Sequence, residues 1–433
     1  MGIKKYIFIF FPYFLFAQNN NLVSPIKHVF SHYSSRNLSI DTISQNQDVF
    51  DYHIALLLPF CVDSNQSILS LNLDSINENY QPELFKKSLI SIDFFNGFLM
   101  ALNNLEYLNF KISVFDIAHD NKSEVILDQI INSRSLRGVD LIVGPLFTDN
   151  FVYFTDNFKK KKVPIIAPFS KKQHIVNNHS NVILIQPSIE NQLKTFSNYI
   201  FDNHSSDNIL LIRRDTLFKK NLKKIVPDSS SIIIDTIIPK DIYLSNNLLH
   251  DVDTTIIKFK EIKINTNVVD SIYHELDTLG SRNVIIIPSE DNVFVTDLLS
   301  KLHACRDTGM IVYGMQNLYN YDHLNFTDLT DMNLSFPYHK MDNSQIISQF
   351  VIAFHNQYQY IPNLRYSVVG YEIATYFSQL LSQSDLILPI LSNIKSSKVL
   401  ENIFDFYQID DNGFINEGVV ILRYDSFGYK KIN

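Results

Sequence analysis

The chain has 433 residues, 45% of them hydrophobic, and this amount of apolar material indicates two globular domains rather than a single hydrophobic core. Its formal net charge is −8 at pH 7, and its lysines and arginines form no basic stripe. Because phosphate binding needs clustered Lys and Arg, this composition argues against nucleic acid as a partner.

The start of the chain has the pattern of an export signal. Lys4 and Lys5 give a positive beginning, and an apolar run covers residues 6–16. Ala17 then supplies a small residue for cleavage. The apolar run is too short to span a bilayer, and no later stretch is long enough. We therefore predict a signal peptide at residues 1–17, a periplasmic mature chain and no stable membrane span.

Residues 18–51 are polar, rich in Asn, Ser and Gln, and without sustained periodicity, which predicts a flexible leader. From residue 52 onward, short apolar runs alternate with amphipathic stretches. This alternation is typical of βαβ units, in which helices cover both faces of a parallel sheet. The first series predicts strands at 54–59, 110–115, 139–145, 163–170 and 182–186, and helices at 88–108 and 123–134.

Two of these strand-like runs, 139–145 and 163–170, end at prolines that are followed by hydroxyl residues. Thr148 follows the first run, and Ser170 closes the second. Ligands bind outside the carboxyl ends of strands in open parallel sheets, so the two loops point to one crevice. Phe169 precedes Ser170 and is placed either to stack on a ligand or to pack the edge of the domain.

A second series predicts strands at 209–212, 232–238, 284–288 and 310–313, with an irregular excursion between residues 238 and 273. Polar residues again follow the strands. A second sheet with polar loop tips would give the crevice an opposite wall. The candidate ligand-binding residues on this wall are Asp215, Ser289, Glu290 and Gln316.

Signatures of catalysis and of metal binding are missing. The sequence has no phosphate loop, dinucleotide glycine fingerprint, nucleophile elbow or paired-histidine zinc helix. His174 and His179 lack a third ligand nearby in the sequence. Cys61 and Cys305 cannot form a disulfide framework, and two unrelated, partly buried thiols are favoured over a single bridge. We predict a non-enzymatic protein with no catalytic residues, no metal site and no cofactor.

The order of the elements resembles the type 1 periplasmic-binding fold, which bacterial leucine and amino-acid binding proteins share with receptor ligand-binding domains. The resemblance covers nearly all of residues 52–433. The segments that carry it are 54–60, 93–101 with Gly97, 139–145, 163–170, 283–291 and 310–316, and a late stretch with Phe350, Phe354, Tyr358, Pro362, Tyr366, Gly370, Tyr371 and Glu372.

The resemblance implies an α/β protein with two doubly wound parallel-sheet lobes joined by a hinge of three crossings. We place the crossings near Pro187, Pro337 and Asp405. Lobe one then consists of residues 52–187 and 338–405, and lobe two of residues 188–337 and 406–433.

In amino-acid-binding members of this family, hydroxyl loops of lobe one hold the ligand carboxylate, and acidic or aromatic groups grip its amine. The resemblance therefore implies that Thr148 and Ser170 bind a carboxylate and that Asp215 and Glu290 bind an amine. The sequence departs from the family pattern at two places. After the first strand of lobe two, Leu217, Phe218 and Lys219 stand where a tyrosine and a glycine are usual, and the late Gly-Tyr pair is followed by Glu372 where Asp is usual.

Two functions are consistent with these observations. The first is a solute-binding protein that closes on a small polar ligand, an amino acid or peptide, for transport or sensing. The second is a cell-envelope regulator or protein-docking scaffold that resembles activators of peptidoglycan synthesis. The expected partner is accordingly a small-molecule ligand or an envelope protein.

Overall fold

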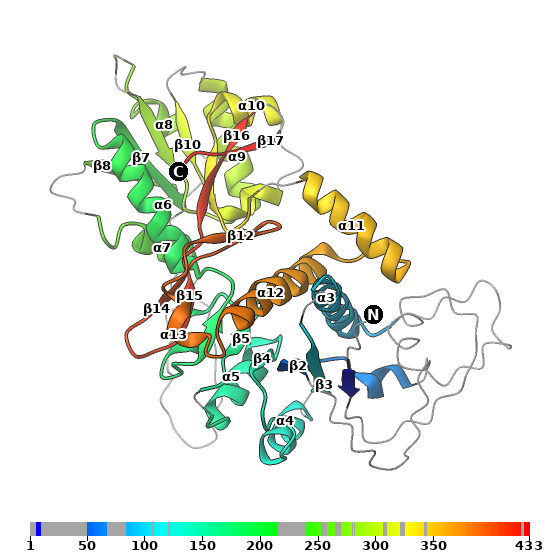
Figure 1. Cartoon of the computed structure of the whole chain (residues 1–433). Helices are drawn as coiled ribbons and strands as arrows, with labels where there is room; N and C mark the ends of the chain where they lie inside the picture. The colour runs from blue at the N-terminus through cyan, green and yellow to red at the C-terminus, as the bar shows by residue number, and fades with distance from the viewer. Residues whose placement is uncertain are drawn as a thin grey trace, which may run out of the picture. The chain divides into compact units, whose positions relative to one another are not determined.

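The computed structural model describes residues 6–9, 50–66, 84–105, 108–119, 122–160, 162–214, 240–252, 258–264, 270–278, 280, 282–305, 310–320, 325–341, 344–425 and 428–433 (Figure 1). The chain forms two compact units. Unit 1 comprises Met1–Ser188 and Asn343–Gly418, and unit 2 comprises Ile189–Asp342 and Val419–Asn433. Among the described residues, no helix combines the length and the apolar character that crossing a membrane requires.

Unit 1 is built on one mixed sheet with the strand order β1-β3-β2-β4-β5-β6-β15-β14, and every neighbouring pair except β14 and β15 is parallel. A short antiparallel pair, β12 and β13, stands apart from it. The elements of unit 1 are β1 (Tyr6–Ile9), β2 (Tyr52–Leu58), η1 (Val62–Asn65), α3 (Lys86–Asn103), β3 (Phe110–Asp116), α4 (Ser123–Asn132), β4 (Leu141–Val143), α5 (Thr148–Asn157), β5 (Ile165–Ala167), η3 (Gln173–Val176), β6 (Val182–Leu184), α11 (Ser344–Tyr358), α12 (Leu364–Gln383), α13 (Leu388–Leu391), β12 (Ser397–Val399), β13 (Asn402–Phe404), β14 (Phe406–Gln408) and β15 (Phe414–Asn416).

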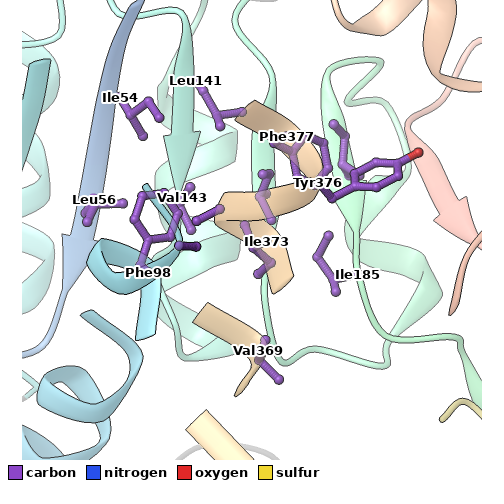
Figure 2. Close-up of a cluster of buried hydrophobic side chains, with 14 of the residues drawn as sticks. Ile54, Leu56, Phe98, Leu141, Val143, Ile185, Val369, Ile373, Tyr376 and Phe377 are labelled. Carbon is purple, nitrogen blue, oxygen red and sulfur yellow. The ribbon is translucent and has the colours of Figure 1, made fainter. Parts of the chain in front are cut away.

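The sheet of unit 1 is buried on both faces, which explains why its strands read as continuous apolar runs. In β2, Ile54 and Leu56 belong to the core on the side of α3 and α12, whereas Ala55 and Leu57 belong to the core on the side of α4 and α5. Successive residues of a strand point to opposite faces, so each strand serves both cores. Figure 2 shows the first core, with α12 side chains such as Ile373 among those of the strands.

Helices α3 and α12 pack closely because a glycine stands at each contact (Figure 1). A Cβ atom on Gly97 of α3 would lie 1.9 Å from the carbonyl oxygen of Ser367, and one on Gly370 of α12 would lie 2.1 Å from that of Phe94. Real Cβ atoms do not approach backbone so closely, and only glycine lets the two helices cross here. Both glycines belong to the segments that carry the family resemblance.

Unit 2 contains a second mixed sheet with the order β17-β16-β11-β10-β9-β7-β8. Its strands β8, β7, β9, β10 and β11 run parallel, and β16 and β17 add antiparallel strands at one edge. The elements of unit 2 are α6 (Ile189–His204), β7 (Asn208–Arg214), α7 (Lys240–Leu248), β8 (Phe259–Ile264), α8 (Asp270–Tyr273), β9 (Asn283–Ile286), α9 (Asn292–Cys305), β10 (Ile311–Tyr313), η4 (Gln316–Asn320), α10 (Phe326–Asp331), β11 (Ser335–Tyr338), β16 (Val420–Asp425) and β17 (Gly428–Lys431).

The α/β class and the two sheets with helices on their faces confirm the predicted fold class. The sheets differ from the prediction in being mixed, because the last strands of the chain add antiparallel pairs at their edges. The third boundary between the units also differs. It falls after Gly418 rather than near Asp405, since β14 and β15 extend the sheet of unit 1 through the pairing of β15 with β6.

Several predicted elements have different limits in the structure, and some lie outside it. The predicted helix 88–108 ends at Asn103. The predicted strand 232–238 lies outside the described residues, whereas β8, within the excursion that the sequence left irregular, pairs in parallel with β7. Tyr6–Ile9, inside the predicted signal peptide, forms β1 and pairs with β3. The signal peptide itself stays a prediction.

A buried polar network joins α3 to the loop between α11 and α12. Asp93 Oδ1 accepts a hydrogen bond of 2.9 Å from the Tyr360 hydroxyl, which in turn accepts one of 3.1 Å from Asn96 Nδ2. Tyr358 donates its hydroxyl to the Asn96 carbonyl at 2.9 Å. Burial raises the pKa of Asp93 to about 6, although the hydrogen bonds from Tyr360 and the Asn363 backbone oppose this shift.

We predict that Gly370→Ala lowers the free energy of unfolding by about 2 to 3 kcal/mol, because the added methyl group forces the backbones of α3 and α12 apart. Urea unfolding followed by circular dichroism measures the change. Gly428→Ala is the matched control, since a Cβ at Gly428 would meet only the Asp425 carbonyl oxygen at an ordinary 3.9 Å. Equal stability of the two variants would contradict the close packing of the helices.

We predict that Asp93 makes the protein less stable as pH rises. Its pKa is higher in the folded chain than in the unfolded chain, so the native state holds the proton more tightly and stability falls between about pH 4 and pH 6. The loss attributable to this group is about 2 to 3 kcal/mol. Urea unfolding of the wild type and of Asp93→Asn at pH 4 and pH 7.5 measures this loss as a change with pH in the stability difference between the two proteins. The same stability difference at both pH values would contradict a raised pKa of Asp93.

Candidate functional site

The carboxyl end of β4 turns sharply at Gly144, which has a φ of +89°. A Cβ atom there would lie 2.5 Å from the Leu57 carbonyl oxygen, so only glycine fits between β4 and β2 at this point. The turn leads through Phe147, the N-cap residue of α5, to Thr148, its first residue. The loop after β4 is thus held against the sheet, and the amino end of α5 lies beside the strand ends.

The structure brings Thr148 and Ser170 together, as the sequence indicated for the two loops. Thr148 Oγ1 donates to Ser170 Oγ at 3.4 Å, and Ser170 Oγ also accepts the Lys172 backbone N–H at 3.3 Å. Ser170 is buried and Thr148 is half-buried. The N-cap Phe147 offers the first turn of α5 no side-chain acceptor. Two hydroxyls and the amino end of a helix therefore form one cluster of donors, which suits an anionic group.

Phe169 packs into the core beside this cluster. Its ring meets those of Phe94 from α3 and Tyr366 from α12 edge-on, with centroids 5.8 and 5.6 Å away. The sequence left open whether Phe169 stacks on a ligand or packs the edge of the domain. These contacts show that it packs there. They also fix the position of the backbone that leads into Ser170.

Phe147 has a different environment, which sequence reasoning missed. The His119 ring lies 4.7 Å from the Phe147 ring, and Lys87 Nζ lies 5.7 Å from the centroid of the same ring. Lys87 Nζ also contacts the His119 ring nitrogens. A lysine ammonium over an aromatic face is attracted to the ring by a cation–π interaction. No spacing in the sequence links His119 to Lys87.

Asp116, at the end of β3, organises the neighbouring strand end. Its carboxylate accepts backbone N–H groups from Cys61 at 3.0 Å, Val62 at 2.9 Å and Ala118 at 3.0 Å. Burial raises the pKa of Asp116, and the three backbone donors act in the opposite direction. The Cys61 thiol lies 3.4 Å from the Pro59 carbonyl oxygen. These bonds fix the turn after β2 against the end of β3.

In unit 2, polar residues also gather where strands end, but they are engaged with one another. Glu290 forms an ion pair with Lys240 at the start of α7. Ser289 is buried, and its Oγ accepts the Asp291 backbone N–H at 3.3 Å. Asp291 in turn pairs with Arg214, at the end of β7, over 2.7 Å. The acid predicted to bind an amine, Glu290, is therefore already matched by a cation.

Asp241, which sequence reasoning did not select, lies buried in this group. It accepts hydrogen bonds from the Ser289 hydroxyl and the Arg214 backbone, and burial raises its pKa. Its Oδ2 atom is buried and has no hydrogen-bond partner among the described residues. The sequence signal for it is the charged pair Lys240 and Asp241 that follows two isoleucines and a proline.

Two further predicted residues complete the set. Asp215 lies outside the described residues, as does the segment around Leu217. Gln316 begins η4 after β10 and is half-buried. Within the described ranges, no three or more His, Cys, Asp or Glu side chains gather in a way that could hold a metal ion.

The overall structure is similar to those of several solved proteins. One is a branched chain amino acid ABC transporter periplasmic ligand-binding protein from Burkholderia xenovorans LB400, with a TM-score of 0.52, 11% identity, and coverage of 88% of this chain and 94% of that chain. Another, from Rhodospirillum rubrum, is a proposed branched-chain amino acid ABC transporter protein, with a TM-score of 0.57, 10% identity, and coverage of 88% and 99%.

A third similar structure is LpoA from Haemophilus influenzae, with a TM-score of 0.50 and 11% identity. The match covers 90% of this chain and 60% of the LpoA chain. No protein-family model and no curated protein matches the sequence. The structural likenesses establish the type 1 periplasmic-binding fold.

We predict that Phe169→Ala lowers the free energy of unfolding by about 2 kcal/mol with no ligand present, because the ring is part of the core. Urea denaturation of the variant and the wild type measures this difference. Tyr407→Ala removes an exposed aromatic ring from the same unit and serves as the control, with a change within about 0.5 kcal/mol. An unchanged Phe169→Ala protein would show that the ring is free for a ligand.

Proposed function

We propose that this protein, which has the type 1 periplasmic-binding fold, is an exported, non-catalytic binder of a small ligand that carries a carboxylate, an amino acid or a short peptide, for transport or sensing. The binding site that we propose is the strand-end edge of unit 1. The similar proteins of known structure include ones described as ligand-binding components of branched-chain amino acid transporters, which supports this class of ligand.

The observation that carries the proposal is the donor cluster at the start of α5. Thr148 and Ser170 lie 3.4 Å apart through their hydroxyl oxygens, beside a helix terminus whose N-cap residue has no side-chain acceptor. A ligand carboxylate can accept from the Ser170 hydroxyl, which the bond from Thr148 orients, and from the backbone N–H groups of the first turn. No covalent step is needed, since hydrogen bonds and the helix dipole hold the anion.

The surroundings of this cluster suggest the rest of the ligand. Lys87 and His119 lie against Phe147, one residue before Thr148, and would place a second polar contact and an aromatic face close to the bound carboxylate. Phe169 is already packed by core residues and is better placed to shape the site than to move onto a ligand.

We predict that a ligand of this class stabilises the exported protein. At a concentration about 100-fold above Kd, it should add about 2.7 kcal/mol to the free energy of unfolding. A thermal-shift screen against the amino acids, short peptides and muropeptides finds the ligand, and calorimetry gives its Kd. Ser170→Ala and Thr148→Val should each weaken binding about tenfold, because the first removes a hydrogen bond to a charged group and the second removes the bond that orients the Ser170 hydroxyl.

The control for this experiment is Ser348→Ala, which removes an exposed hydroxyl that bonds only within its own helix, α11. Its Kd should equal that of the wild type. Binding that survives in the Ser170→Ala, Thr148→Val double variant would exclude the donor cluster as the site. A screen without any stabilising compound at millimolar concentration would count against the solute-binding function itself.

The second candidate function is that of a cell-envelope regulator or docking scaffold. The similarity to LpoA, an activator of a peptidoglycan synthase, favours it, because the matched region includes 90% of this chain. In this case the surface formed by Lys87, His119 and Phe147 would contact a protein rather than a free ligand. Cross-linking from a photoreactive residue at position 87 in intact cells tests this function. We expect repeated capture of one peptidoglycan synthase, and we expect Phe147→Ala to abolish this capture.

A further inference from the structure

In the part of the chain that the structure describes, the edge of the sheet in unit 1 is formed by β3 and, beyond it, by the four residues of β1. The pairing is parallel, with Tyr6 opposite Lys111 and Ile9 opposite Val114. β3 has seven residues, so the edge extends past β1 to Asp116. If the predicted signal peptide is cleaved at Ala17, β1 leaves with it and β3 becomes the edge strand. A bare edge strand offers a row of backbone donors and acceptors to another extended segment.

A cavity of about 1130 Å³ runs beside this edge. Lys111, Ser113 and Phe115 of β3 line it, and these alternate residues share one face of the strand. Its other wall includes Ile126, Gln129 and Ile130 of α4. A groove between an edge strand and a helix is the geometry in which proteins bind peptides as an added strand, with alternate side chains of the peptide in the groove.

Two polar groups on the strand wall of the groove, the Ser113 hydroxyl and the His53 imidazole, are neutral and lie in contact with each other. Ser113 Oγ and His53 Nε2 lie 2.8 Å apart, and both residues are buried. Burial, with a smaller contribution from Lys111, lowers the pKa of His53 to about 4. The imidazole is therefore uncharged at pH 7 and accepts the Ser113 hydroxyl. Together with Phe115 and the two isoleucines of α4, this wall suits apolar side chains.

Cations gather at one end of the groove. In the pairing of β2 with β3, His53 stands opposite Lys111, near the start of β3. The backbone N–H of Asp140 donates to the His53 carbonyl, and this bond places the loop after α4 at the same end of the strands. This loop contributes Arg134 and Arg137, both exposed, to the lining. Three cations thus lie where a parallel guest strand would begin. A guest with an acidic residue ahead of its apolar run would complement them.

We propose that the β3 edge and its groove are a docking site for an extended segment of another envelope protein, in which an acidic residue precedes apolar residues at alternate positions. The guest lies parallel to β3, in the register that β1 takes in the full chain. Main-chain hydrogen bonds to β3 hold it, and the cations around Lys111 set its direction. This site is separate from the donor cluster at Thr148 and does not depend on the proposed ligand.

The probe for this site is a fluorescent peptide with two glutamates ahead of the β1 sequence Tyr-Ile-Phe-Ile. Anisotropy measures its binding to protein exported by a bacterial host, with the N-terminus verified by mass spectrometry. We expect saturable binding, and about tenfold weaker binding when two lysines replace the glutamates or when the protein carries Lys111→Glu. Equal binding of the two peptides would overturn the proposed direction and charge matching.

Gln129→Trp tests the groove, because Gln129 is exposed on α4 and a tryptophan there would fill the space beside β3 without entering the core. It should abolish binding. Val125→Trp, at an exposed position of the same helix outside the lining, should leave binding unchanged. Circular dichroism checks that both variants fold. Undiminished binding to Gln129→Trp, or no binding of the glutamate peptide to the wild type at millimolar concentration, would refute the site.

Discussion

The contact between α3 and α12 is the constraint on which unit 1 depends. Gly97 and Gly370 allow the two backbones to meet, and this contact sets where both helices lie on the sheet. Each helix then supplies an aromatic residue, Phe94 or Tyr366, that holds Phe169. Because Phe169 precedes Ser170, the packing of two helices determines where a candidate ligand donor stands. A recognition site on a rigid element needs such support, since small displacements of its groups weaken binding.

A buried side chain that forms hydrogen bonds with several backbone groups fixes the last segment of unit 1, residues 406–418. Asn416 Nδ2 donates to the carbonyls of Ile185 at 2.9 Å and Ile403 at 2.8 Å, and its Oδ1 accepts the N–H groups of Asp405 and Gly418. One amide thus joins β15 to three other segments. Buried polar networks that are fully satisfied hold a single arrangement, which explains why residues 406–418 remain with unit 1.

Glu372 has a comparable role. It is fully buried in α12, and its carboxylate accepts the backbone N–H groups of Glu401 and Asn402, each at 2.9 Å, and the Asn402 side-chain amide. The sequence resemblance pointed to this residue. In the structure, Glu372 holds the turn between β12 and β13 in place through these hydrogen bonds. A buried carboxylate needs such donors to offset the loss of its hydration.

The elements best predicted from the sequence are those whose signal is local. The continuous apolar runs of β2, β4 and β5 identify strands buried on both faces, and the hydroxyls after two of them indicated the pairing of Thr148 with Ser170. The contacts of Lys87 with His119, and of Asp241 with Ser289, join residues far apart in the chain, so no spacing encodes them. The third boundary was misplaced for the same reason, because the pairing of β15 with β6 is long-range.

The strand β8 was missed because its residues alternate between charged and apolar types in a pattern unlike that of the buried strands. It closes one edge of the sheet in unit 2, and Lys260, Glu261 and Lys263 are exposed along it. Charges on an edge strand oppose its pairing with strands of other molecules. The second sheet therefore ends in an edge whose charges disfavour edge-to-edge aggregation.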